Sequence, residues 1–192
     1  MPEARDLPLS RWGEEIRRTR VARREQRSRS AAAAVAAFTV TALVATMFWQ
    51  PRPRLVWNVS ASAPVGLYLV GSPDHVRAGE TVIAWTPEPA RALAAERHYL
   101  PSNVPLVKRV AAVAGDRVCA IGEAIWVNGR HAGARRAVDG ADRPMPAWTG
   151  CRELESGEYF LLMENPDSFD GRYFGVTRRE HIVGRAVLLW AR

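Results

Sequence analysis

The feature that most constrains this chain is an uncharged segment of 19 residues that runs from Ala31 to Trp49. As an α-helix it would extend over roughly 28 Å, which is just enough to cross the hydrocarbon core of a bilayer. Phe48 and Trp49 close the segment, where aromatic side chains favour the interface between lipid and water. Residues 31–49 are therefore predicted to form a transmembrane anchor.

Two other structures could produce such a segment, a cleaved signal peptide and an apolar helix in a soluble core. The 30 residues before it are long for a signal peptide, and residues 47–50 offer no small-residue cleavage site. A core helix would carry polar side chains along one stripe, whereas this run has only threonines. Both alternatives fit less well than an anchor.

The arginines before the segment predict its orientation. Residues 1–30 hold nine arginines and five acidic residues of a chain with net charge +7, and only Arg52 and Arg54 directly follow the segment. A basic run followed at once by an apolar span favours the bilayer, and not nucleic acid, as the partner. The positive-inside rule makes residues 1–30 a basic cytoplasmic tail and residues 55–192 an extracytoplasmic domain. We expect a single-pass protein of the inner (cytoplasmic) membrane, with that domain in the periplasm of a Gram-negative cell.

The domain after the anchor is predicted to be mainly β. One helix is expected at residues 88–99, and residues 130–150, which show no clear period, are interpreted as a long surface excursion. Asn128-Gly129 is a strong hairpin turn. Gly, Pro and Asp separate short β-type runs, which predict strands at residues 67–70, 81–85, 106–113, 125–127, 159–163 and 182–190.

Cys119 and Cys151 are the only cysteines. In an oxidising compartment they could pair, which would stabilise the fold by about 3 to 4 kcal/mol on the chain-entropy estimate. Two unrelated buried thiols are the alternative. We expect no metal and no other cofactor, because the cysteines are far apart and the four histidines lack ligand spacing.

Lys108 is the only lysine among the 27 Lys and Arg residues. An ammonium group can lose its proton, whereas a guanidinium in a protein does not. The neighbouring residues are almost all apolar, and burial in such a setting lowers the pKa of a lysine. Lys108 is therefore a candidate general base, with an ordinary surface lysine as the alternative.

Two further segments carry polar side chains. Ser60 and Ser62 alternate in a stretch that would be extended, so they would share one face just before Pro64 and Gly66 bend the chain. Either segment alone is also typical of an ordinary loop. The second, residues 163–175, is a polar turn between two predicted strands that contains Ser168, Asp170 and Arg172.

Together the three segments resemble the type I signal peptidase family of serine-lysine proteases, most closely its TraF-like conjugative-transfer branch. The resemblance covers residues 55–190 and implies a signal-peptidase-like β catalytic domain with one N-terminal transmembrane helix. Residues 60–68 (SASAPVGLY) resemble the nucleophile segment, residues 108–116 (KRVAAVAGD) the lysine box, and residues 165–174 with 182–186 the closing box.

The resemblance also implies roles for single residues. Ser62 would be the nucleophile and Lys108 the general base. The remaining roles are an oxyanion-hole hydroxyl from Ser60, orientation of the lysine by Ser168 and Asp170, and structural roles for Gly115, Asp116 and Arg172.

Two positions depart from the family pattern. Ala63 stands where the wider family has Met, and Met163-Glu164-Asn165 stands where it has Gly-Asp-Asn, which leaves the role of Glu164 open. A Ser-His-Asp triad is the alternative chemistry, but no G-x-S-x-G elbow accompanies the serine. Such a triad would combine Ser62 with His75, His98, His131 or His181.

These features predict a membrane-anchored serine endopeptidase that cleaves exported precursors after small residues. The serine would be the nucleophile, because a neutral lysine can deprotonate it. The branch that the chain resembles favours a conjugative pilin or another transfer-apparatus precursor as substrate, processed by hydrolysis or by cyclisation. A housekeeping type I signal peptidase is one alternative. A non-catalytic, membrane-tethered assembly or scaffold domain with the same fold is another. A soluble self-cleaving repressor would need a DNA-binding domain where this chain has its apolar segment.

Overall fold

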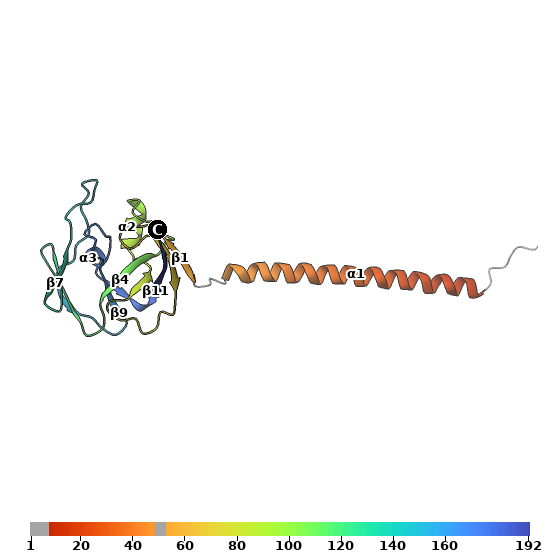
Figure 1. The fold of residues 1–192 in the computed structure, drawn as a ribbon. Helices are drawn as coiled ribbons and strands as arrows, with labels where there is room; N and C mark the ends of the chain where they lie inside the picture. Colours follow the sequence, from red (N-terminus) through yellow and green to blue (C-terminus); the bar gives the residue numbers. More distant parts are fainter. Residues whose placement is uncertain (1–7, 49–52) are drawn as a thin grey trace, which may run out of the picture. The chain divides into compact units, whose positions relative to one another are not determined.

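The computed structural model describes residues 8–48 and 53–192, and the chain divides into two compact units. The first unit contains helix α1 (Pro8–Phe48), and the second contains all the strands that the structure describes (Figure 1).

Helix α1 has 41 residues, which corresponds to about 62 Å of helix axis. By length and composition it could cross a membrane. It covers the predicted anchor as far as Phe48, while Trp49 lies outside the described residues. Thr39 Oγ1 donates to the Val35 carbonyl and Thr41 Oγ1 to the Ala37 carbonyl, both at 2.9 Å. These threonines therefore suit a lipid environment, because their hydroxyl protons are satisfied within the helix.

The same helix includes basic residues for which the sequence analysis predicted no helix. From Glu14 to Phe48 the chain contains neither glycine nor proline, and Arg, Ala, Glu and Gln are frequent. These residue types favour a helix even where no apolar face repeats. Intrinsic propensity thus explains why the basic and apolar parts form one continuous helix.

The second unit is built from two antiparallel sheets joined through β4 and β5 (Figure 1). The larger has the order β1 (Leu55–Asn58), β2 (Gly66–Val70), β11 (Ile182–Ala191), β3 (Thr81–Ala84), β4 (Leu106–Ala112), β9 (Glu158–Leu161) and β10 (Val176–Arg178). The smaller has the order β7 (Arg130–Ala134), β6 (Ala124–Val127), β5 (Arg117–Ile121) and β8 (Gly150–Glu153). The short helices are α2 (Ala90–Glu96), α3 (Gly171–Phe174) and the 3-10 turn η1 (Arg179–His181).

The mainly β prediction is confirmed, and all six predicted strands are present as β2, β3, β4, β6, β9 and β11. The Asn128-Gly129 turn joins β6 to β7, with positive φ at both residues, as a tight hairpin requires. The interpretation of residues 130–150 as a surface excursion was wrong at both ends, where β7 and β8 lie. β7 and β8 contain glycine, histidine and arginine, which do not indicate a strand in the sequence. Their strand structure is specified by pairing with β6 and β5 rather than by their own propensity.

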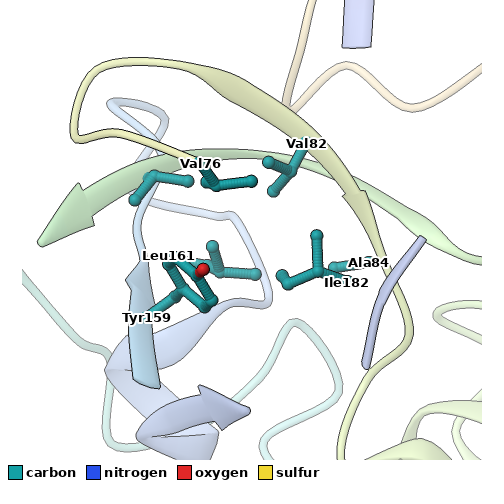
Figure 2. Packing of buried hydrophobic residues seen from close by; sticks show 7 residues of the cluster. Val76, Val82, Ala84, Tyr159, Leu161 and Ile182 are labelled. Carbon is teal, nitrogen blue, oxygen red and sulfur yellow. The ribbon is translucent and has the colours of Figure 1, made fainter. Parts of the chain in front are cut away.

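Three clusters of buried side chains form the core. Figure 2 shows the first, in which Val82, Leu161 and Ile182 converge from three strands. The third cluster lies behind the Ser60–Ser62 segment and supports it; its buried members are Ala63, Tyr68, Ile83, Val107 and Ala186.

Cys119 and Cys151 lie opposite each other on β5 and β8, with their Cα atoms 4.0 Å apart, and form a disulfide. The bond closes the small sheet at the two strands that flank residues 124–149. Because it links β5 to β8, it holds in place the strand that ends the connection between β7 and β8.

One face of β1, β2 and β11 is apolar and largely exposed. The strand register aligns its side chains in two cross-strand rows. The first row contains Leu55, Leu69 and Val187, and the second contains Trp57, Leu67 and Trp190. Within the second row the rings of Trp57 and Trp190 are in contact, with centroids 5.5 Å apart.

Candidate active site

The Ser60–Ser62 segment follows β1 and is shaped by a buried asparagine. Asn58 Nδ2 donates to the carbonyls of Ser60 (2.9 Å), Ala63 (3.2 Å) and Pro64 (3.1 Å), and Asn58 Oδ1 accepts from the Ser60 amide at 3.1 Å. Asn58 was not among the residues predicted from the sequence, where its only signal was a turn-forming residue two positions before a serine. Gly66, which begins β2, allows the backbone of β11 to approach closely, because a Cβ there would lie 2.0 Å from the Trp190 carbonyl oxygen.

The two serines contact each other. Ser60 Oγ and Ser62 Oγ are 2.9 Å apart, and the Ser62 amide donates to Ser60 Oγ at 3.3 Å. The hydroxyl and the amide expected to bind an oxyanion are therefore adjacent, and each is engaged by the other serine.

Lys108 lies on β4 and is only 2% exposed. Its Nζ donates to Ser62 Oγ at 3.0 Å and to Ser168 Oγ at 2.6 Å. Residues that are 46 and 60 positions apart from Lys108 along the chain thus meet at one nitrogen.

Burial lowers the pKa of Lys108 from 10.5 to about 8. The nearby Asp170 carboxylate opposes this shift and raises the pKa, while the Arg172 guanidinium lowers it further. Desolvation is the largest of these effects. Burial of Lys108 among apolar neighbours is therefore the main reason why its pKa is low.

Ser168 is held by a turn that a buried ion pair organises. All five side-chain N–H groups of Arg172 are used: Nε and Nη2 donate to the Asp170 carboxylate at 2.8 and 3.2 Å, and the others reach backbone carbonyls. Asp170 also accepts the Met163 and Arg172 amides. The carbonyl partners of Arg172 are Ala134 and Pro166, both at 3.0 Å, and Met163, at 2.6 Å.

The two residues that were expected to orient the lysine, Ser168 and Asp170, therefore have different positions relative to it. Ser168 contacts Lys108 directly, but Asp170 makes no hydrogen bond to it among the described residues. The Asp170 carboxylate is occupied by Arg172 and by two backbone amides, so it acts on Lys108 through its charge and through the shape of the turn.

Gly115 and Asp116 form the turn between β4 and β5. Gly115 has φ +86°, a conformation that favours glycine, and its amide donates to the Leu154 carbonyl at 2.9 Å. Asp116 accepts from the Val113 amide at 2.8 Å and from Asn128 Nδ2 at 2.7 Å. The pair thus connects the strand that carries Lys108 to the small sheet.

Glu164 pairs with Arg109 at the surface, with 3.0 Å between Arg109 Nη1 and Glu164 Oε1. The Glu164 side chain is 90% exposed, so the pair adds little to stability.

Two cavities meet at Ser62. One, of about 670 Å³, is lined by the segments that precede Ser62 and Lys108 and by residues 136–145. The other, of about 700 Å³, lies toward the Arg109–Glu164 pair. Ala61, Ser62 and Asn165 line both. A peptide chain could therefore pass from one cavity to the other across the Ser62 hydroxyl.

None of the four histidines lines either cavity, so the geometry offers no support for a Ser-His-Asp triad. Within residues 8–48 and 53–192, no group of three His, Cys, Asp or Glu side chains could hold a metal ion.

Comparison with known proteins gives the family. The family model described as signal peptidase, peptidase S26, matches residues 27–191. A plasmid transfer protein TraF from Escherichia coli is 33% identical over 147 residues, which cover 69% of this chain and 82% of that protein. A probable conjugal transfer protein TraF from Sinorhizobium fredii is 32% identical over 139 residues, covering 67% of this chain and 73% of that protein.

The chain therefore belongs to the signal peptidase family, peptidase S26, and is similar to its TraF members. A signal peptidase I crystal structure from Enterococcus faecalis aligns with 58% of this chain and 97% of its own, at 17% identity and a TM-score of 0.35.

Replacing Lys108 by Met tests the pKa of this lysine. The pKa is lower in the folded than in the unfolded chain, so the folding penalty of the ammonium is complete below pH 8 and disappears as the pH approaches 10.5. The free energy of unfolding of the wild type, measured against that of Lys108→Met, should therefore rise over this window by up to about 3 kcal/mol. Denaturant titrations of the full chain in detergent micelles measure it.

Arg109→Met is the matched control, because Arg109 is the next residue on β4, is half exposed and carries a surface guanidinium instead of a buried amine. Its stability difference from the wild type should be flat over the same window. A flat difference for Lys108→Met would contradict the lowered pKa.

Proposed function

We propose that this protein is a membrane-anchored serine endopeptidase in which Ser62 is the nucleophile and Lys108 the general base. The observation that carries the proposal is the 3.0 Å contact between Lys108 Nζ and Ser62 Oγ, with the lysine buried and its pKa near 8. A serine hydroxyl is a weak nucleophile until a base removes its proton, and a lysine serves as that base only when it is neutral.

In the first step neutral Lys108 takes the proton of Ser62 Oγ, and the oxygen attacks the carbonyl carbon of the scissile peptide bond. The hydrogen bond to Ser168 Oγ keeps the lysine nitrogen pointed at Ser62. The carbonyl oxygen becomes an oxyanion, for which the Ser62 amide and the Ser60 hydroxyl are the adjacent donors. To serve it, the Ser62 amide exchanges Ser60 Oγ for the substrate oxygen.

The protonated Lys108 then gives its proton to the leaving amine, the C–N bond breaks, and the acyl group stays on Ser62 Oγ. A water molecule, or a peptide amine, gives a proton to Lys108 as it attacks this ester. The bond between the acyl carbon and Ser62 Oγ then breaks, and Ser62 Oγ takes the proton back from Lys108. Hydrolysis gives a free carboxyl end, and attack by an amine of the same chain gives a cyclic product. The same lysine acts in both halves of the cycle, as the base does in other serine proteases.

The two cavities suggest how a substrate would lie. The cavity of about 670 Å³ is bounded by residues 56–60 and 104–107, where β1 has an unpaired edge and β4 has not yet paired with β9. An extended peptide could add to these edges, which suits the acyl side of the substrate. The leaving side would then occupy the second cavity, next to Arg109 and Glu164.

The similarity to TraF proteins of plasmid and conjugal transfer supports a precursor of a conjugative transfer apparatus as the substrate. A pilin-like precursor fits a domain that meets its substrate outside the cytoplasm. Cleavage after a small residue fits a nucleophile that lies in a narrow turn between two chain segments.

The exposed apolar face of β1, β2 and β11 supports a location of the domain at the membrane surface. Tryptophans such as Trp57 and Trp190 favour the interface between lipid and water. A domain held in this way would meet precursors close to the point where they leave the bilayer.

Ser62→Ala and Lys108→Arg should each lower kcat/KM for a precursor about a thousandfold or more, because the first removes the nucleophile and the second replaces the base by a group that stays protonated. Full-length enzyme in detergent, incubated with candidate pilin precursors from the same genetic locus, is analysed by mass spectrometry, which reports both the cleavage site and any cyclic product.

Arg179→Lys is the control for Lys108→Arg, because Arg179 is exposed and pairs with Asp74 away from both cavities. It should keep wild-type activity. Full activity of Ser62→Ala would support the scaffold alternative and exclude the proposed mechanism.

The pH dependence of kcat/KM should follow the neutral form of Lys108. Activity is expected to rise with pH through an apparent pKa near 8 and then to level off, because the base is protonated below this value. Ester and peptide substrates should give the same pKa, since it belongs to the free enzyme. A profile that falls between pH 7 and 9 would contradict a lysine base.

The orientation of the chain can be tested with a tag at each end. In spheroplasts, added protease should remove a C-terminal tag and spare an N-terminal one, because the arginines precede the span. Replacing Arg17, Arg18, Arg20, Arg23 and Arg24 by glutamine should increase the fraction of inverted chains. Protection of the C-terminal tag in the wild type would overturn the proposed topology.

A further inference from the structure

Residues 136–145, which we call the roof segment, form part of the wall of the larger cavity. Their lining members are Arg136, Val138, Asp139, Gly140 and Met145. The roof segment belongs to the connection between β7 and β8, which the sequence pattern presents as a loop without a role. Its position beside Ser62 and Lys108 gives this connection a place in the site.

The roof segment is a small hairpin with its own hydrogen bonds. Val138 bridges Pro144, the Met145 amide donates to the Ala137 carbonyl at 2.8 Å, and the Asp139 amide donates to the Arg143 carbonyl at 2.9 Å. Asp139 Oδ1 accepts the amides of Ala141 and Arg143 across the tip. The hairpin is thus a defined element.

The hairpin is tied to the chain that follows α2. The Tyr99 hydroxyl donates to Asp139 Oδ2, which also accepts from Arg143 Nε at 2.8 Å and from Arg97 Nη1 at 3.4 Å. Arg97 Nη1 donates to the Pro144 carbonyl at 2.9 Å as well. The hydrogen bond from Tyr99 lowers the pKa of Asp139, so the Asp139 carboxylate stays charged at neutral pH. We call this hydrogen bond the Tyr99–Asp139 latch.

The latch also reaches the turn that holds Ser168. The Tyr99 ring contacts the Phe169 ring, with centroids 5.5 Å apart, and Phe169 stacks on Tyr173 at 5.8 Å. The Tyr173 hydroxyl accepts the Arg136 amide at 3.2 Å. Both ends of the roof segment are therefore fixed to elements that line the same cavity.

We propose that the roof segment is a specificity wall, held by the Tyr99–Asp139 latch, that binds an uncharged apolar side chain of the substrate on the acyl side of the scissile bond. This inference rests on the proposed function of Ser62 and Lys108, and it adds residues that select the substrate. The roof segment touches neither reacting atom, so its residues determine which peptide binds.

The chemistry of the wall indicates the class of side chain. The two charged side chains of the roof segment that line the cavity are already paired, Asp139 with Arg97 and Arg143, and Arg136 with Asp167 at 2.6 Å. What the wall offers is the apolar surface of Val138 and Met145, and elsewhere the cavity is lined by Leu100, Val104 and Val59. A charged side chain would find no unpaired charge among the lining residues of the roof segment, whereas a leucine would exclude water from its apolar surface.

Binding to an inactive enzyme tests this wall. The full chain with Ser62→Ala, in detergent micelles, is titrated with a fluorescein-labelled peptide that carries alanine at the cleavage position and leucine three residues before it. A second peptide has serine in place of the leucine. Fluorescence anisotropy gives the Kd of each, and their ratio measures the preference for the apolar side chain.

Two added substitutions address the wall. Tyr99→Phe removes only the latch hydroxyl, and Val138→Asp places a charge on the wall at a position that is 41% exposed and so tolerates it. Each should weaken binding of the leucine peptide by about fivefold to tenfold and change the serine peptide less, so that the ratio falls. Tyr159→Phe is the matched control, because Tyr159 lies in the core away from both cavities (Figure 2).

A ratio that stays at the parent value in both variants would overturn the proposal, as would equal losses in Tyr159→Phe. The melting temperature of each variant shows whether the substitution destabilises the whole fold or only the wall. If Tyr99→Phe lowers the melting temperature, Val138→Asp provides the test. Because these measurements need no turnover, they are independent of the peptidase activity. A wild-type enzyme that cleaves no precursor, combined with roof-dependent binding, would contradict the proposed function and leave the wall established.

Discussion

The buried ion pair between Asp170 and Arg172 is the interaction on which the rest of the site depends. Each of the five side-chain N–H groups of Arg172 has an acceptor, on Asp170, on the turn that precedes it, or on Ala134 at the end of β7. A buried pair with every group satisfied specifies one arrangement, because any other would leave a charge without a partner. This pair holds the small sheet, the Ser168 turn and strand β9 in one arrangement. That arrangement places Ser168 where it can bind Lys108.

Lys108 is held in a place that suits a neutral amine better than an ammonium. Burial on β4 lowers its pKa, and the charges of Asp170 and Arg172, which act in opposite directions, partly cancel at its nitrogen. The folded chain at neutral pH therefore carries a free-energy cost of about 3 kcal/mol at this one residue. Such a cost is typical of a residue whose protonation state serves chemistry rather than stability.

Much of this arrangement could be predicted from the sequence, and the exceptions have physical reasons. Strands β2, β3, β4, β9 and β11 consist largely of aliphatic and aromatic residues and were found; β7 and β8 draw their stability from partners and were not. Ser62, Lys108 and Ser168 could be singled out because each carries reactive or polar chemistry in a distinctive segment. Asn58 and the Tyr99–Asp139 latch have no such signal, since Asn58 acts by binding the backbone of the turn that follows it, and the latch joins residues 40 positions apart along the chain.

The near absence of lysine also has a structural explanation. Arg172 uses a planar fork of five donors to join several carbonyl groups and a carboxylate, which a lysine with one nitrogen could not do. Arg97 similarly connects the chain after α2 to two points of the roof segment. At position 108 the structure has one nitrogen between two hydroxyls. Arginine therefore supplies cations that fix the shape of the site, and in the proposed mechanism the lysine supplies a charge that must be able to disappear.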